Sequence, residues 1–181
     1  MQINKKSILK NGKQIIIRNA IESDAKIVTD ISNTVIKETR FLSRTPEDRV
    51  ERADDTREYI IDCLDSPNES FLIAEYDGKI VGFAHLDSNG YRIKYRHRSS
   101  IALSILKDYW GLGIGGRLMI TLIEQAKTAG YEQIELSVIE ENTSAVNMYQ
   151  SFGFEIYGRE PHAMKFSENE YGDYLSMVKF L

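Results

Sequence analysis

Six residues near the middle of the chain, Gly111-Leu-Gly-Ile-Gly-Gly116, carry the clearest chemical signal. Glycine permits tight backbone turns and lets a ligand approach the N–H groups closely. The segment precedes an amphipathic pattern from Leu118 to Ala126, which predicts a helix closed by Gly130. The first N–H groups of a helix lack intrahelical partners and carry partial positive charge, so the segment predicts a phosphate or diphosphate site. The alternative is a tight turn that binds nothing.

The spacing of Gly111, Gly113 and Gly116 also matches a dinucleotide fingerprint, with Glu132 and Glu135 about 20 residues further on. However, the glycines do not directly follow a predicted strand. The 65 residues after Gly116 are also too few for the remaining strands of a doubly wound nucleotide fold. The segment lacks the Gly-Lys-Ser/Thr ending of a P-loop. A dinucleotide-binding oxidoreductase is therefore the weaker alternative.

A second pattern, Asn-x-x-Ala-x-x-x-Tyr-x-x-x-Gly-Phe, covers residues 142–154. Asn142 suits a helix N-cap, and Tyr149 carries a phenol that could donate a proton. Together the two patterns resemble the GNAT superfamily of N-acetyltransferases. That family's motif Arg/Gln-x-x-Gly-x-Gly/Ala stands here as Trp110-Gly-Leu-Gly113-Ile-Gly115, with Trp110 in place of the usual Arg or Gln. The departure removes a polar side chain but leaves the backbone donors unchanged.

The resemblance implies a mixed α/β fold: a central, mostly antiparallel sheet with a splayed pair of parallel strands, and helices on both faces. It implies acetyl-CoA as co-substrate, with the pantetheine arm lying like an extra strand at the splay. The Ile105 N–H would then bind the thioester oxygen, and Tyr149 would be the general acid toward the departing sulfur. The cofactor-binding residues implied are Leu103, Ser104, Ile105, Trp110, Gly111, Leu112, Gly113, Ile114, Gly115, Gly116 and Asn142.

The general base is left open by the sequence. Many family members carry a glutamate on the central strand, but Ile101-Ala-Leu-Ser-Ile105 contains none. The alternatives are His97, Glu38, Glu75 or a chain of water molecules. Histidine side chains ordinarily titrate near neutrality. Glu38 lies in the region where, in the family, the first helices form a wall of the acceptor site. Glu38 and His97 are therefore the candidate substrate residues.

The activity implied is transfer of acetyl from acetyl-CoA to a primary amine of a small molecule, amino acid or peptide, directly within a ternary complex. The segment Glu170–Met177 resembles a closing segment of members that acetylate small amines and amino acids. A non-catalytic module that binds or senses acyl-CoA is the alternative from a different class.

The elements that must position these groups follow from hydrophobic periodicity. Asp77-Gly78 predicts a hairpin and Asn89-Gly90 a turn. A helix is expected to begin with Thr45 as N-cap and Pro46 in its first turn, and to run to about Asp65. Further helices are expected at 27–36, 118–126 and 144–151, and strands at 14–18, 71–75, 80–86, 100–106, 133–139, 154–158 and 175–181.

Composition adds broad limits. The length of 181 residues predicts one domain, residues 1–181, and the net charge of −4 disfavours a nucleic-acid partner. The basic segment 91–98 is interpreted as a solvated loop. The single cysteine, Cys63, is expected in the core. Because one cysteine cannot form an intrachain disulfide, a reducing compartment, the cytoplasm, is favoured. We expect no metal, since His85 and His162 lack ligand spacing, and no membrane span; the family resemblance favours a homodimer.

Overall fold

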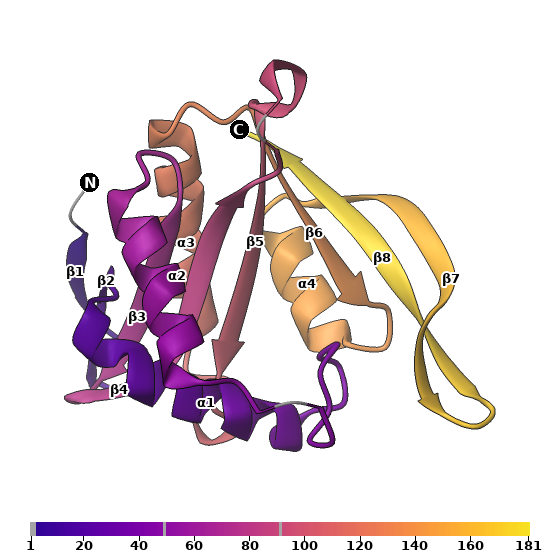
Figure 1. Cartoon of the computed structure of the whole chain (residues 1–181), viewed down its shortest axis with the longest axis horizontal. Coiled ribbons are helices and arrows are strands. Elements are labelled where there is room, and N and C mark those ends of the chain that lie inside the picture. Colours follow the sequence, from indigo (N-terminus) through magenta and orange to yellow (C-terminus); the bar gives the residue numbers. More distant parts are fainter. Residues whose placement is uncertain (1–2, 49, 91) are drawn as a thin grey trace.

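The computed structural model describes residues 3–48, 50–90 and 92–181. Within them lies a sheet of eight strands in the order β1-β2-β3-β4-β5-β6-β8-β7 (Figure 1). All neighbouring strands are antiparallel except β5 and β6. The strands are β1 (Asn4–Ile8), β2 (Gln14–Asn19), β3 (Ser70–Tyr76), β4 (Lys79–Ser88), β5 (Arg98–Ile105), β6 (Gln133–Ile139), β7 (Glu155–Ser167) and β8 (Glu170–Phe180).

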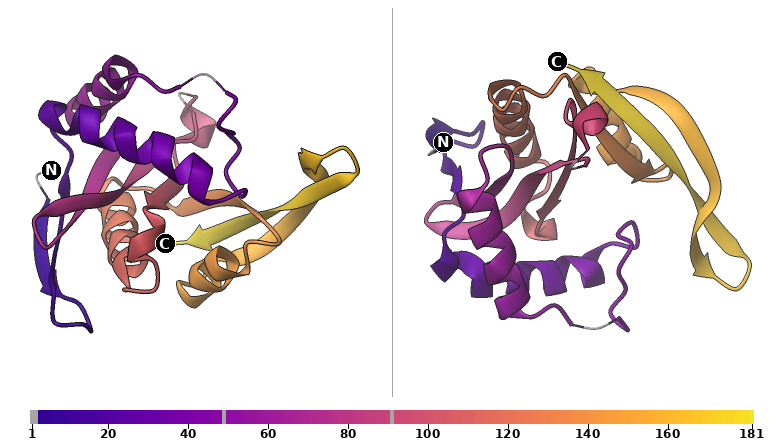
Figure 2. Two further views of the ribbon diagram at one scale, coloured as in Figure 1. Left: turned by 90° about the horizontal axis from the view of Figure 1, so that it is seen from below. Right: turned by 45° about the horizontal axis from the view of Figure 1, so that its top comes forward.

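Helices cover both faces of this sheet. The longer ones are α1 (Ala25–Glu38), α2 (Ala53–Asp65), α3 (Ile114–Thr128) and α4 (Thr143–Ser151). Seen along the sheet, α1 and α2 lie on one side, and α3 and α4 lie on the other (Figure 2). The expected fold class, a mixed sheet with helices on both faces, is confirmed.

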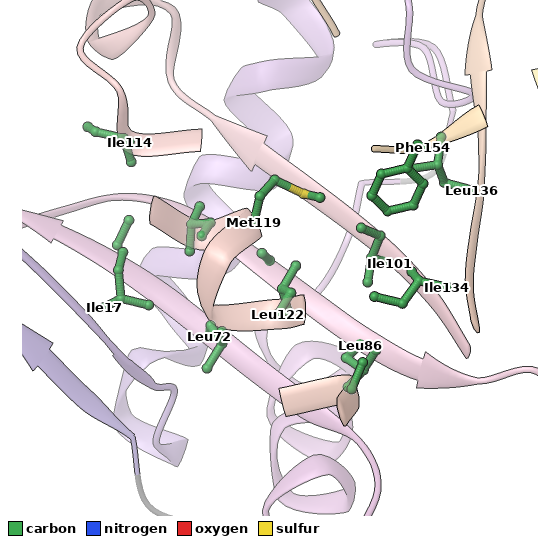
Figure 3. Close-up of a cluster of buried hydrophobic side chains, with 14 of the residues drawn as sticks. Ile17, Leu72, Leu86, Ile101, Ile114, Met119, Leu122, Ile134, Leu136 and Phe154 are labelled. Atoms are coloured by element: carbon green, nitrogen blue, oxygen red, sulfur yellow. The ribbon is translucent and has the colours of Figure 1, made fainter. Parts of the chain in front are cut away.

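The period of two along the strands divides the core between these faces. In β3, Leu72 and Ala74 pack with α3, whereas Phe71 and Ile73 pack with α1 and α2. The larger cluster includes Met119 of α3 (Figure 3). Cys63 of α2 is 5% exposed and belongs to the smaller cluster, so its expected place in the core is confirmed. Burial raises the pKa of its thiol to about 12.

The parallel pair β5 and β6 is joined only at its beginning. Register pairs run from Arg98–Gln133 to Ser100–Glu135, and beyond them the strands diverge (Figure 1). The Arg98 guanidinium donates two hydrogen bonds of 2.6 Å to the Glu135 carboxylate. This ion pair holds the closed end of the splay that the family resemblance implied.

The expected helix start at Thr45 is wrong. Residues 45–48 form one isolated turn, in which the Thr45 N–H donates to Asp48 Oδ2 at 2.7 Å. The helix α2 begins only at Ala53, with Arg52 as its N-cap in extended geometry. The reason is tertiary: the Glu51 carboxylate accepts from Arg44 (2.6 Å) in the loop and from Ser32 (2.5 Å) on α1. These bonds draw the segment onto α1 and away from helical geometry.

The sheet edges also differ from expectation. Strand β1 was not predicted, because its residues are mostly exposed and polar and pair only with β2. At the other edge β7 and β8 extend well beyond residues 154–158 and 175–181 and form a hairpin that projects from the body (Figure 1). The register of β7 shifts between Glu160 and Met164, where Pro161 lacks an N–H for the ladder. Pairing with β8, rather than local propensity, sets this length.

Candidate functional site

The glycine segment forms the connection between β5 and α3. A 3₁₀ turn at Lys107–Tyr109 leads into it, and Gly113 is the N-cap of α3. Gly111 and Gly113 have φ angles of +74° and +85°, in the left-handed region that favours glycine. A Cβ atom on either residue would meet nothing within 4 Å. The predicted turn is confirmed, and its outer surface is open to a ligand.

Several amides at the start of α3 have no helical partner. The N–H of Arg117 makes the first intrahelical bond, to the carbonyl of Gly113 (3.3 Å), so the N–H groups of Ile114, Gly115 and Gly116 have no i−4 acceptor. The Ile114 side chain is 1% exposed and anchors this turn in the core. Such a set of amides at a helix start suits a diphosphate.

Gly115 has a further, structural role. A Cβ on it would lie 3.2 Å from the Met148 sulfur of α4 and 3.5 Å from a methyl of Ile105. The absence of a side chain therefore lets α3, α4 and the end of β5 pack closely. Leu112, Met148 and Tyr149 are half-buried against the same core cluster.

The backbone of β5 faces the diverging strand at alternate residues. The Leu106 N–H donates to the Val81 carbonyl (3.0 Å), which makes Gly82 and Ile105 a non-hydrogen-bonded pair. The N–H and C=O groups of Leu103 and Ile105 consequently point away from β4, toward the β6 side. Trp110 Nε1–H donates to the Ile105 carbonyl at 2.7 Å, so the indole ties the glycine turn to the strand end.

Tyr149 lies on α4, with its ring edge-to-face against Phe154 at a centroid distance of 5.8 Å. Burial raises the pKa of Tyr149 to about 12. In the described part of the chain no protein group forms a hydrogen bond with the Tyr149 hydroxyl. The phenol thus keeps its proton at neutral pH. Asn142 accepts the Ala145 N–H through Oδ1 (3.3 Å), so its N-cap role is confirmed, while a contact with the cofactor stays a prediction.

A cavity of about 220 Å³ lies on the opposite face of the sheet, between α1, α2 and strands β3 to β5. Apolar side chains of α1, β3 and β4 form part of its wall. The polar lining consists of Ser32, Ser43, Arg44, Glu51, Thr56, Tyr59, His85 and Ser104. Because side chains alternate along β5, Ser104 faces this cavity, whereas Leu103 and Ile105 pack on the α3 side. One strand therefore borders both the glycine turn and the cavity.

A polar network that sequence reasoning missed lies in the wall of this cavity. His85 Nδ1 is 2.7 Å from Asp87 Oδ2 and 3.1 Å from the Tyr59 hydroxyl, which also donates to Asp87 Oδ1. Burial alone would raise the pKa of Asp87, but hydrogen bonds from His85 and Tyr59 outweigh it and lower that pKa. Burial, followed by the bond to Asp87, raises the pKa of Tyr59. The i, i+2 spacing of His85 and Asp87 on a predicted strand was a usable signal, but Tyr59 is far away in sequence.

The candidate substrate residues are not brought together. Glu38 Oε2 accepts the Lys107 N–H at 2.8 Å, which fixes the end of α1 beside the approach to the glycine turn, outside the cavity lining. His97 precedes β5, and the length of that strand separates it from Ile105 by about 26 Å. It lines a different cavity, of about 540 Å³. Glu75 pairs with Arg18 (3.6 Å) and lies outside the cavity lining.

The remaining expectations concern surfaces and metals. In the basic segment 91–98, Tyr91 lies outside the described residues, and residues 92–96 are exposed, as a solvated loop would be. Within residues 3–48, 50–90 and 92–181, no three His, Cys, Asp or Glu side chains gather as metal ligands. Of the helices in these ranges, none has both the length and the apolar character needed to cross a bilayer.

Comparison with known proteins agrees with this geometry. An N-alpha-acetyltransferase of Sulfurisphaera tokodaii is 27% identical over 80% of this chain and 83% of its own length. A crystal structure of a GNAT-family acetyltransferase from Streptococcus pneumoniae superposes with a TM-score of 0.86 at 29% identity, covering 92% of this chain and 99% of that one. The putative acetyltransferase yncA of Salmonella typhimurium, solved with its cofactor acetyl-CoA, has a TM-score of 0.82 at 20% identity over 92% and 94% of the two chains.

The extent of these matches varies. The chain spans only 39% and 48% of the lengths of two other curated relatives that it matches. Residues 36–154, which include α2, most of the cavity lining, the glycine turn and Tyr149, match the model of the acetyltransferase (GNAT) family. The chain therefore belongs to the acetyltransferase (GNAT) family.

Proposed function

We propose that this protein is an acetyl-CoA-dependent N-acetyltransferase that acts on a primary amine. The observation that carries the proposal is the glycine turn: open space at Gly111 and Gly113, unpartnered amides at the start of α3, and the outward-facing backbone of Ile105. These groups fit a diphosphate followed by an extended, amide-containing arm. Acetyl-CoA would supply the acetyl group as a thioester.

The residues of the site then have distinct roles. The amides from Leu112 to Gly116 hold the diphosphate, and the backbone of Leu103 and Ile105 orients the arm. The Ile105 N–H polarises the thioester carbonyl, in the manner of an oxyanion-hole donor. Tyr149, whose pKa burial raises to about 12, keeps the proton that the departing sulfur needs.

The acceptor amine would enter from the other face of β5. The cavity of about 220 Å³ suits a small molecule, an amino acid or the terminal residue of a peptide. Both substrates could bind at once, because the cavity lies on one face of β5 and the arm would lie along the backbone edge of the same strand. Direct transfer is also favoured by the state of Cys63, the only cysteine, whose burial in the core and raised pKa make it a poor acyl carrier.

The test is acetyl-CoA consumption with a panel of small amines, amino acids and peptides, followed by mass spectrometry of the products. An N-acetylated product with one CoA released per acetyl group supports the proposal. Binding of acetyl-CoA without stimulation by any amine would instead support a non-catalytic acyl-CoA module. Thermal stabilisation by NAD but not by CoA would favour the dinucleotide alternative, because a ligand stabilises the state it binds.

Two further expectations stay predictions of the same proposal. A reducing compartment, the cytoplasm, is expected from the single buried cysteine. A homodimer is expected from the family resemblance, and light scattering of the purified protein measures it.

A further inference from the structure

His85 and Ser104 face the same cavity from neighbouring strands. In the β4–β5 register Phe83 lies opposite Ser104, and His85 lies opposite Ala102. His85 and Ser104 are therefore diagonal neighbours, about 7–8 Å apart, and both line the cavity. An amine nitrogen held beside Ser104 would be within reach of the imidazole, directly or through one water molecule.

The hydrogen bonds of His85 fix which ring nitrogen accepts a proton. Nδ1 lies 2.7 Å from the carboxylate of Asp87, whose lowered pKa keeps it ionised at neutral pH. Nδ1 therefore carries the ring proton and donates it to Asp87, which leaves the lone pair on Nε2. The ring is also held by its neighbours: Phe71 stacks on it at 6.1 Å and Tyr59 contacts it edge-on at 5.6 Å. The imidazole is thus oriented before any acceptor binds.

The groups around the ring differ in charge from one packed element to the next. On α2, Tyr59 and Cys63 stay protonated because burial raises their pKa. Across the cavity, Glu51 is paired with Arg44 at 2.6 Å, and α1 and β5 contribute only uncharged lining, such as Ser32 and Ser104. Asp87, together with Glu69 before β3, is the negative charge on the His85 side. A carboxylate bonded to Nδ1 both orients an imidazole and stabilises its protonated form.

We propose that His85, oriented by Asp87 and Tyr59, is the general base of the acetyl transfer; this inference rests on the proposed function. His85 Nε2 takes one proton from the acceptor ammonium, which frees the nitrogen lone pair. The C–N bond forms as the C–S bond breaks. The nitrogen loses its second proton and the sulfur gains one, so this step leaves the number of protons unchanged. The products are an amide, a thiol and an imidazolium, which returns its proton to solvent. The network supplies the base that the missing strand glutamate would have provided.

The experiment compares His85→Gln with wild type, using the best amine from the panel, as kcat/KM from pH 6 to 10. We expect a loss of about 10²–10⁴-fold near pH 7 for His85→Gln. The loss should shrink as pH rises toward the pKa of the amine, because solvent then removes the proton. Calorimetry should give an unchanged Kd for acetyl-CoA. The same substitution at an exposed residue of β7, His162→Gln, should leave the profile at the wild-type level.

A second variant separates chemistry from folding. Asp87→Asn keeps the side-chain size but offers Nδ1 a donor, which moves the ring proton to Nε2 and removes the base; a comparable loss with a similar pH dependence is expected. If His85→Gln does not fold, Asp87→Asn decides in the same assay. A loss below about threefold in these variants, or a deficit that is constant across the pH range, overturns the inference while the proposed function stands. Wild-type protein that acetylates no amine overturns both.

Discussion

A single methyl group at Gly113 tests the diphosphate site. Gly113→Ala forces a residue with a side chain into φ of +85°, at a strain of about 1–2 kcal/mol. The new methyl meets no protein atom within 4 Å, so the protein itself leaves room for it. It would project into the space where the diphosphate is proposed to lie. The variant should therefore lose both stability and cofactor affinity.

The chain offers a matched control at the other end of α3. Gly130 has φ of +83°, and a Cβ there also meets nothing within 4 Å. Gly130→Ala should therefore carry the same strain, and each variant should melt about 2–8 °C below wild type. The 15 residues of α3 separate the two glycines by about 22 Å. Any difference between the variants in ligand binding therefore reports on the turn itself.

The affinity loss can be sized from the bonds at risk. Displacing the diphosphate from one charge-assisted amide bond costs about 1.5–3 kcal/mol, which corresponds to about 10- to 150-fold in Kd. We expect this loss in Gly113→Ala by calorimetry with CoA, and a wild-type Kd in Gly130→Ala. If Gly113→Ala binds CoA as tightly as Gly130→Ala does, the diphosphate does not lie on this turn and the proposed function loses its main support.

Three other predictions concern single side chains. Tyr149→Phe should lower kcat by about 10²–10⁴-fold with little change in the Kd for acetyl-CoA. In an alkaline absorbance titration the variant should lack one phenol with a pKa of about 12. An unchanged kcat would rule out the role of Tyr149 as general acid. Glu38→Ala replaces the side-chain acceptor of the exposed Lys107 N–H by water, so we expect about 0.5–1.5 kcal/mol lower unfolding free energy in urea and weaker CoA binding. Glu38→Gln, which keeps an oxygen acceptor, should stay near wild type. Hydrogen bonds from Arg98 hold the pKa of Glu135 below its ordinary value, so this pair stabilises the fold above about pH 4.5 and loses that contribution as pH falls through the lowered pKa. Glu135→Gln should be less stable than wild type at pH 7, and the difference should shrink as the pH is lowered below about 4.5. A stability equal to wild type at pH 7 would mean that the pair contributes nothing.

Much of the fold was accessible from local pattern. The strands predicted from the apolar runs at 71–75 and 80–86, the Asp77-Gly78 hairpin and the amphipathic helix after the glycines are all present. Thr45 had the local features of a helix start, but tertiary bonds to the Glu51 side chain prevailed over them. The antiparallel pair at 154–158 and 175–181 is present, but strand β1 and the outer part of the β7–β8 hairpin were missed, because exposed strands carry little hydrophobic alternation. That residues 1–181 form one domain stays a prediction.

The site, like the fold, was predictable from the sequence only in part. The turn and its open amides were predicted because left-handed glycines and a helix start involve only neighbouring residues. The polar network of His85 was not predicted, because its third member, Tyr59, is 26 residues away from His85 in sequence and the spacing of His85 and Asp87 alone does not indicate a site. The choice between Glu38 and His97 was equally undetermined, since it depends on which end of β5 each approaches.

By itself the sequence determined the glycine turn, the helix that follows it and the proton-bearing phenol of Tyr149 on α4, because steric limits and helix-end bonding act over a few residues. Tertiary structure alone decided where β5 and β6 part, which face of β5 meets the cavity, and how Tyr59, His85 and Asp87 come together. These features depend on bonds between segments far apart in the chain. Such bonds form only when buried apolar faces dock the helices against the sheet in one register.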